Sequence, residues 1–345
     1  MTLEATLEPG GGASGEASGD ASGTRRPRGR LRFVVGRLVG LVVTLLATSF
    51  LVFASMYAAP GDPVSFLLQG RSPSPDAVAA IKAQYGLDQP FLLQYLHWLG
   101  GILHGDFGRS LEYHQSVGEL ILGRLPVTLA LVALSAVIIL VVGLGAGIVG
   151  ALRAGRFADK SVLVLVTVLA AVPSFVAAIL LISVFSVRLG WFPTYGSGTG
   201  PLDTLYHLTL PAIALSLTFI ALLGRVTRSS MLDELGREHV EVAVSRGVPY
   251  PTVVRRHVLR NALGPISTIS GLLVAGLLVS SAVVESAFGL DGVGSLLVQA
   301  VGRLDFPVVQ ALVLIVVAVF VVINTAIDLL YPLIDPRVGA GDSAR

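Results

Sequence analysis

A lysine–serine pair at 160–161 is the first candidate for chemistry, because it ends a stretch, AGRFADKS, similar to the end of a phosphate-binding loop. In such a loop the lysine and the hydroxyl hold nucleotide phosphates and magnesium, and a glycine must stand directly before the lysine. Asp159 occupies that position here, and the only other lysine is Lys82. The sequence therefore predicts no ATP site of this kind.

Three histidines form the second candidate. His97 and His104 are seven residues apart, which places both on one face of a helix, and His114 follows. No carboxylate stands beside them at ligand spacing, so the pattern favours exposed surface histidines over a metal site. Cysteine is absent, which excludes disulfides, thiolate ligands and a cysteine nucleophile. We therefore predict no catalytic residue, no metal and no cofactor in this chain.

The third candidate is residues 241–266, EVAVSRGVPYPTVVRRHVLRNALGPI, a charged segment between two long apolar stretches. Residues 236–246 predict a short helix that ends at Gly247, a residue suited to a left-handed helix cap. Pro249 and Pro251 then interrupt the chain, and a proline such as Pro251 fits the first turn of a second helix.

The second helix has two distinct faces. Val254, Val258 and Ala262 share one of them, and Arg256 and Arg260 lie together on another. Two short helices joined at an elbow would form a rigid projection suited to docking against a partner, and we call residues 229–262 the knob. From these residues alone, a solvated loop that lies against lipid is an equally good interpretation.

The elements that must carry the knob are membrane helices. Hydrophobic residues make up 53% of the 345, charged residues only 13%, and the mean hydropathy is +0.79. Six runs of 21 to 28 residues contain no Asp, Glu, Lys or Arg: 38–61, 125–152, 161–187, 204–224, 261–284 and 306–327. Each is long enough to cross the hydrocarbon of a bilayer as a helix. A shorter stretch, 89–105, predicts an amphipathic surface helix.

The basic residues predict the orientation. With both termini in the cytoplasm, the inner segments hold 18 of the 24 lysines and arginines and the outer segments six. This asymmetry follows the rule that positive charge stays inside. The basic residues do not form one face, so nucleic-acid binding is not indicated. The knob is then cytoplasmic, and the spans contain no acids or paired carboxylates that would suit proton pumping or catalysis in the membrane.

We divide the chain as follows: a disordered cytoplasmic tail at 1–30, the first transmembrane helix at 31–61, an external insert at 62–119, a five-helix core at 120–335, and a cytoplasmic tail at 336–345. The knob belongs to the core. Glycines in the second and fifth spans predict close helix packing, with a gating role as the alternative, and they are Gly143, Gly145, Gly147, Gly150, Gly271 and Gly276. Pro173 and Pro211 should kink or open the third and fourth spans.

From about Arg32 to Arg337 the chain resembles the inner-membrane permease subunits of the oligopeptide and dipeptide ABC importers. Residues 241–247, EVAVSRG, are similar to the "EAA" coupling motif of these permeases, with Val242 in place of the second alanine. Further matches, in order, are APGDP (59–63), GDFGRSL (105–111), LPVTLAL (125–131), RHVLRNAL (256–263), VVESAFGLDGVGSLLVQAV (283–301), DFPVVQ (305–310) and DLLYPLIDPR (328–337).

The resemblance implies an all-α integral membrane protein with the six-helix fold of type I importer permeases, in the cytoplasmic membrane. It implies four kinds of partner: a second homologous permease, two ABC ATPase subunits that bind the ATP, an extracytoplasmic solute-binding protein and a peptide solute. It also implies that the 236–247 helix enters a cleft on the ATPase. Glu241 would offer a carboxylate there, Ala243 would allow close approach, and Gly247, after Arg246, would set the direction of the helix.

Alternatives within and beyond this class stay open. Related importers carry nickel chelates or glutathione, and the pathway residues are not evident from one sequence. A passive channel would need no ATPase partner. An enzyme would need a reactive constellation, and the sequence shows none.

Overall fold

The computed structural model describes residues 28–58 and 88–334, and within these ranges the chain folds into helices with one isolated β-bridge, between Arg109 and Ser116. The predicted all-α membrane fold is thus confirmed. Residues 1–27, 59–87 and 335–345 lie outside the described part, and with them most of the predicted tails and the first half of the external insert.

Among the described residues, five helices or helix runs are long and apolar enough to cross a membrane. They are α1 (Arg28–Ala58), the run α5–η1–α6 (Val117–Ile138, Ile139–Gly143, Leu144–Leu152), α9 (Pro201–Leu235), the run α11–η3–α12 (Tyr250–Val253, Val254–Leu259, Arg260–Ala287) and α14 (Phe306–Ile334). A sixth membrane span is formed if one bent pair of helices counts as a single broken span. The pair consists of α7 (Phe157–Ala171) and α8–η2 (Ser174–Leu181, Ile182–Arg188). The six predicted spans fall on these six units.

The break in the third span lies at the predicted proline. The two halves meet at an angle of 96°, with Val172 extended (ψ 116°) directly before Pro173. A proline disfavours the helical conformation of the residue before it and supplies no N–H to the preceding turn, which accounts for the break. Pro211 behaves differently, because α9 continues through it from Pro201 to Leu235 as one helix.

The central helix is α9, which packs against α5, α6, α7, α8 and α12. Glycines bring η1 and α6 close to it. A Cβ on Gly143 would lie 3.2 Å from the Leu223 side chain, and one on Gly147 only 2.5 Å from Cβ of Thr227. These contacts give the predicted glycines a packing role. Gly145, with nothing within 4 Å, takes no part in the contact.

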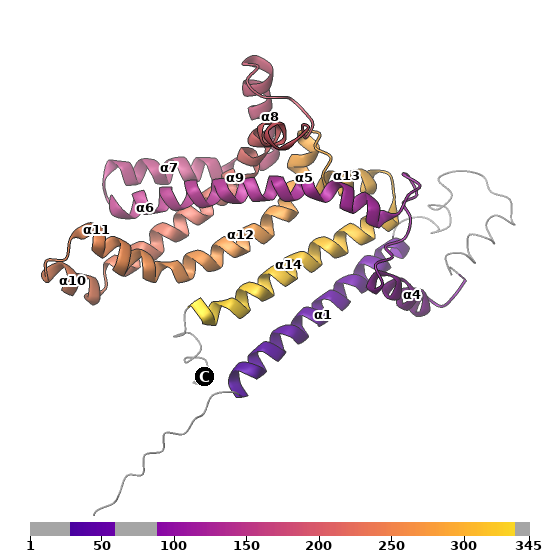
Figure 1. Cartoon of the computed structure of the whole chain (residues 1–345), viewed down its shortest axis with the longest axis horizontal. Helices are drawn as coiled ribbons and strands as arrows, with labels where there is room; N and C mark the ends of the chain where they lie inside the picture. The colour runs from indigo at the N-terminus through magenta and orange to yellow at the C-terminus, as the bar shows by residue number, and fades with distance from the viewer. Residues whose placement is uncertain (1–27, 59–87, 335–345) are drawn as a thin grey trace, which may run out of the picture.

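Different short helices lie at the two ends of the bundle (Figure 1). The first residues of α1, the last residues of α14 and the short helix α10 (Glu238–Ser245) lie at the left end, and α4 (Phe91–Leu103) and α13 (Val293–Gly302) at the right. One large apolar core runs along the bundle, from Phe288 and Leu290 after α12 to Val240 and Ala243 in α10. A smaller core joins α5, α13 and α14 at the end opposite α10. We call the two ends the knob end and the far end.

Helix α4 corresponds to the predicted surface helix. Its thirteen residues span about 20 Å, too short to cross a bilayer. It lies on α1, with the buried Tyr95 hydroxyl 2.8 Å from the Ser49 hydroxyl, and exposes Leu92 and Leu96 outward. Its polar contacts therefore face the protein and its leucines face the surroundings.

Candidate functional site: the knob

The first helix of the knob, α10, has an inner and an outer face. Val240 and Ala243 point into the core and are 4% and 7% exposed. On the outer face Glu241 is exposed, and Val242 and Val244 are 48% and 51% exposed. Residues three apart share a face of a helix, which explains why 240 and 243 are buried together. The outer face of α10 therefore presents a carboxylate and two valines to the surroundings.

Gly247 closes α10 with a Schellman motif. Its φ is +76°, the N–H of Gly247 donates to the carbonyl of Val244 at 2.9 Å, and the N–H of Val248 donates to the carbonyl of Ala243 at 3.2 Å. These are the two bonds that define this helix ending, and they need a left-handed residue, which glycine adopts without strain. The left-handed cap predicted for Gly247 is confirmed. A Cβ there would meet nothing within 4 Å, so the backbone alone demands glycine.

The second half of the knob turns back toward the bundle. Pro251 lies in the first turn of α11, as predicted, and one π-helical segment, η3, carries the chain into α12. Val258 and Ala262 are buried, whereas Arg256 and Arg260 are exposed, which confirms the two predicted faces. The inner faces of both halves join the main core of the bundle.

Polar contacts hold the knob to itself. Glu234, at the end of α9, pairs with Arg237 at 3.1 Å and lies 3.8 Å from Nε2 of His239. The same His239 nitrogen lies 3.3 Å from the side-chain nitrogen of Asn261 in α12. These residues join the beginning of the knob to its end, and sequence reasoning missed them. The sequence indicated only the pair of Glu234 and Arg237, which carry opposite charges and lie three residues apart.

The predicted contact residues divide into two groups. Within the described chain, neither the Glu241 carboxylate nor the Arg246 guanidinium has a hydrogen-bond or ion-pair partner, and both residues are exposed. Ala243 is instead covered by the core of its own chain. A direct contact of Ala243 with a partner's cleft does not fit this position. Its small side chain lets α10 lie close to the bundle, and Val242 and Val244 are the side chains presented outward.

The lysine–serine pair and the three histidines, the other candidates for chemistry, form no reactive site in the described part of the chain. Asp159 binds Arg228 rather than preceding a phosphate-binding lysine. His97 is exposed on α4, and Nδ1 of His104 contacts the carbonyl of Gly100 at 2.8 Å. In the described part of the chain, no three His, Asp or Glu side chains, His114 included, come together in a way that could hold a metal ion.

Two family models cover most of the chain. The model described as "Binding-protein-dependent transport system inner membrane component" matches residues 139–340, which include the knob, and its N-terminal companion matches residues 30–132.

Individual relatives agree with these matches. A putative peptide transport system permease protein of Brucella abortus is 41% identical over 297 residues, 85% of this chain and 94% of the relative. The oligopeptide transport system permease protein of Bacillus subtilis is 38% identical over 300 residues, 85% of this chain and 95% of the relative. A glutathione transport system permease protein of Salmonella choleraesuis is 37% identical over 295 residues, 86% and 94% of the two chains.

The fold has a solved counterpart. A chain of the MetNI methionine ABC transporter, solved in inward-facing conformations, superposes with a TM-score of 0.52 over 62% of this chain and 96% of that one. At 19% identity this likeness concerns the fold alone.

Proposed function

The chain belongs to the family of binding-protein-dependent transport system inner membrane components, and from this premise we propose that it is the permease subunit of an ABC importer for peptides. The peptide assignment is supported by the peptide and oligopeptide permeases among its relatives, at 38–41% identity over most of both chains. It moves solute across the membrane, and separate ATPase subunits bind and hydrolyse the ATP.

The observation that carries the coupling role is the construction of the knob. Its inner face is buried in the core of the bundle, its end is fixed by the Schellman motif at Gly247, and its outer face leaves Glu241 and Arg246 free of partners within the described chain. The knob is packed firmly against the bundle on one side and accessible on the other. A partner that binds the accessible side can therefore displace the knob, and the displacement reaches the bundle. The ATPase subunits would bind this outer face.

We place the knob end in the cytoplasm. The 18-to-6 distribution of basic residues supports this orientation, and the first and last residues of the described chain lie at the same end as α10 (Figure 1). ATP-driven closure of the ATPases would then shift the bundle between inward-facing and outward-facing states. A second permease would complete the pathway, and a solute-binding protein would deliver the peptide at the far end.

The test is reconstitution of the complex. A tagged chain is purified from the membranes of its own host, and we expect two ATPase subunits and a second permease to co-purify. In proteoliposomes, labelled peptide should then enter only with ATP and the solute-binding protein. Uptake without ATP would favour a passive channel. Glutathione uptake without peptide uptake would favour the second candidate, which the 37% identical glutathione permease supports.

A further inference from the structure

Helix α7 packs against α9 and α6 but buries few of its residues. Of its fifteen residues only Asp159 and Val166 are buried, and large side chains such as Val164, Leu165 and Val168 are 57–63% exposed. An apolar helix needs no burial to stay in lipid, but it needs specific contacts to hold one position against its neighbours. Asp159 is one of the two buried residues of α7 and the one that makes polar contacts.

Asp159 binds the central helix with both carboxylate oxygens. Arg228 of α9 donates from Nε to Oδ1 at 2.7 Å and from Nη2 to Oδ2 at 2.8 Å, and the N–H of Gly155 donates to Oδ2 at 2.9 Å. A two-pronged bond between a guanidinium and a carboxylate fixes orientation as well as distance. Gly150 of α6 lies against the same pair, since a Cβ there would be 3.2 Å from Arg228 and 3.5 Å from Asp159. The pair thus joins α6, α7 and α9.

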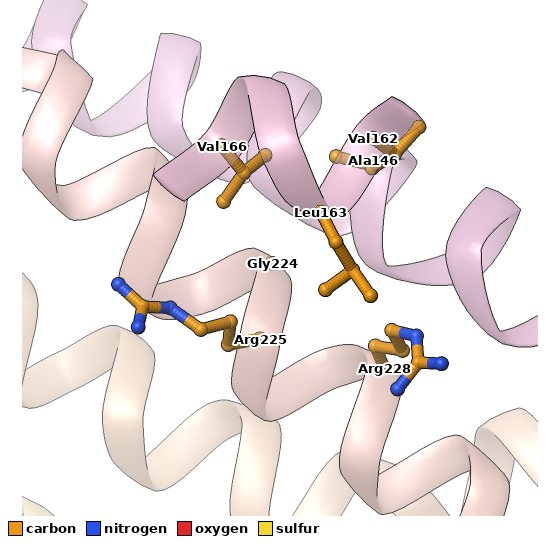
Figure 2. A pocket seen from close by; sticks show the side chains of 7 residues that line it. All are labelled: Ala146, Val162, Leu163, Val166, Gly224, Arg225 and Arg228. Atoms are coloured by element: carbon orange, nitrogen blue, oxygen red, sulfur yellow. The ribbon is translucent and has the colours of Figure 1, made fainter. Parts of the chain in front are cut away.

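Beside this pair, α7 and α9 pack through mostly apolar groups. Val162, Leu163 and Val166 of α7 face Gly224 and Arg225 of α9 across a small cavity of about 10 Å³ (Figure 2). In this view the Arg228 side chain extends away from that of Arg225. A cavity of this size holds no more than about one water molecule, so the apolar side chains fit closely. The charged pair adds a contact of fixed direction to this apolar packing.

Arg228 also stands close to the knob. It lies seven residues before Leu235, the last residue of α9, which is about 10 Å along the helix. Met231 belongs to the same buried core as Val240 of α10, and Leu235 packs against that core. A displacement of α10 therefore reaches Arg228 through packed side chains of one short segment.

We propose that Asp159 and Arg228 are a positioning pair for transport, which makes α7 follow the knob when the ATPases move it. This inference rests on the proposed function and extends it, because it names the contact that carries the displacement from α9 to α7. The shared apolar core transmits the push from α10 to α9, and the charged pair transmits it from α9 to α7. Without the pair, α9 would move while α7 stays behind, and ATP would be hydrolysed with little solute moved.

The experiment is a double-mutant cycle on the reconstituted complex, with Asp159→Asn, Arg228→Gln and the double variant. Two quantities are measured at matched amounts of assembled complex: the ATPase rate and the peptide taken up per ATP hydrolysed. We expect each single variant to assemble and hydrolyse ATP but to lose about fivefold or more in uptake per ATP. The double variant should lose no more than either single one, because both changes remove the same contact. Lys160→Gln, which removes an exposed charge from the same turn, should leave the ratio unchanged.

Each other outcome is decisive. An unchanged ratio of uptake to ATP in the single variants would overturn the proposal. Failure of all three variants to assemble would also overturn the proposal, because the pair would then serve folding alone. Equal losses in ATPase rate and in uptake would overturn it as well. These results leave the proposed function intact as long as the wild-type complex shows ATP-dependent uptake. Absence of that uptake in the wild type would instead contradict the proposed function itself.

Discussion

The Ser110 hydroxyl donates a hydrogen bond of 2.5 Å to Oδ2 of Asp305 and so joins two buried residues 195 positions apart in the sequence. Asp305 also accepts from the backbone N–H groups of Leu111 and Glu112, at 3.3 Å each. One carboxylate thus holds the loop after α4 against the beginning of α14. The described second half of the predicted external insert is attached to the core in this way.

Replacing Asp305 by Asn should loosen this loop, because an amide offers one acceptor oxygen where the carboxylate uses two. The exposed Arg109 beside Ser110 gives a site for trypsin, and we expect faster cleavage there in Asp305→Asn than in the wild type. Asp291→Asn, at an exposed carboxylate between α12 and α13, is the control and should cleave at the wild-type rate. Equal cleavage of Asp305→Asn and the control would show that other contacts hold the loop.

A second buried carboxylate, Glu285, organises the connection between α12 and α13. It accepts a bond of 2.8 Å from the Thr128 hydroxyl and one of 2.9 Å from the N–H of Ser295, and the Thr128 oxygen in turn accepts from the N–H of Val293 at 2.8 Å. The Glu285 carboxyl group lies at the beginning of α13, with the N–H of Ser295 donating to it.

Thr128→Val keeps the shape of this side chain and removes both bonds, so a buried N–H and a buried carboxylate each lose a partner. The cost should be about 1–3 kcal/mol, visible as a lower Tm of the purified chain in detergent. Thr209→Val makes the same chemical change at a half-buried residue whose hydroxyl makes an exposed bond within its own helix. A Tm drop no larger than that of the control would contradict a structural role for Thr128.

Gly147→Ala tests the contact between α6 and α9. The new Cβ would lie 2.5 Å from Cβ of Thr227 and 2.7 Å from the carbonyl oxygen of Gly224, so the two helices must move apart. Overpacking of this kind costs about 1–3 kcal/mol. Gly145→Ala, where nothing lies within 4 Å, gains helix propensity and should be neutral or stabilising. Equal Tm values for the two variants would be evidence against the close contact.

Val244→Asp tests the outer face of α10. Val244 is 51% exposed, so a carboxylate there leaves the fold intact but puts an unpaired charge into the surface proposed to contact an ATPase. We expect co-purification of the ATPase subunits to fall while the Tm of the isolated chain stays unchanged. Ala154→Asp adds the same charge at an exposed position between α6 and α7 and should leave co-purification intact. Normal assembly of Val244→Asp would place the contact elsewhere.

Local features of this fold could be predicted from the sequence. Charge-free runs located the spans, because a membrane tolerates few charges. Pro173 indicated a kink, because proline removes a helix hydrogen bond and disfavours the helical conformation of the residue before it. Gly247 was identifiable as a cap since its role depends on neighbours four residues away or fewer. The angle of 96° at Pro173 and the continuity of α9 through Pro211 depend on packing between helices, which one sequence does not reveal.

Contacts between residues far apart in the sequence could not be predicted, because they too depend on how the helices pack. Asp159 was noticed only as the residue that spoils a phosphate-binding loop, and its partner Arg228 lies 69 positions away. The inward direction of Ala243 follows from where the bundle sits relative to α10, which decides which side of a short helix is covered.

Gly247 provides the most direct test of the claim that the knob couples ATP hydrolysis to transport. Gly247→Val meets no side chain, but it forces a β-branched residue into a left-handed conformation at a cost of about 1–2 kcal/mol or more, or it opens the Schellman motif. Gly247→Asn fills the same open space with a residue that tolerates this conformation.

The measurement is ATP-dependent peptide uptake by the reconstituted complex, together with ATPase co-purification, for the wild type and both variants at matched membrane abundance. We predict that Gly247→Val loses uptake or assembly and that Gly247→Asn keeps most of both. Wild-type uptake and wild-type assembly in Gly247→Val would contradict the account, and the knob would then be an ordinary solvated loop.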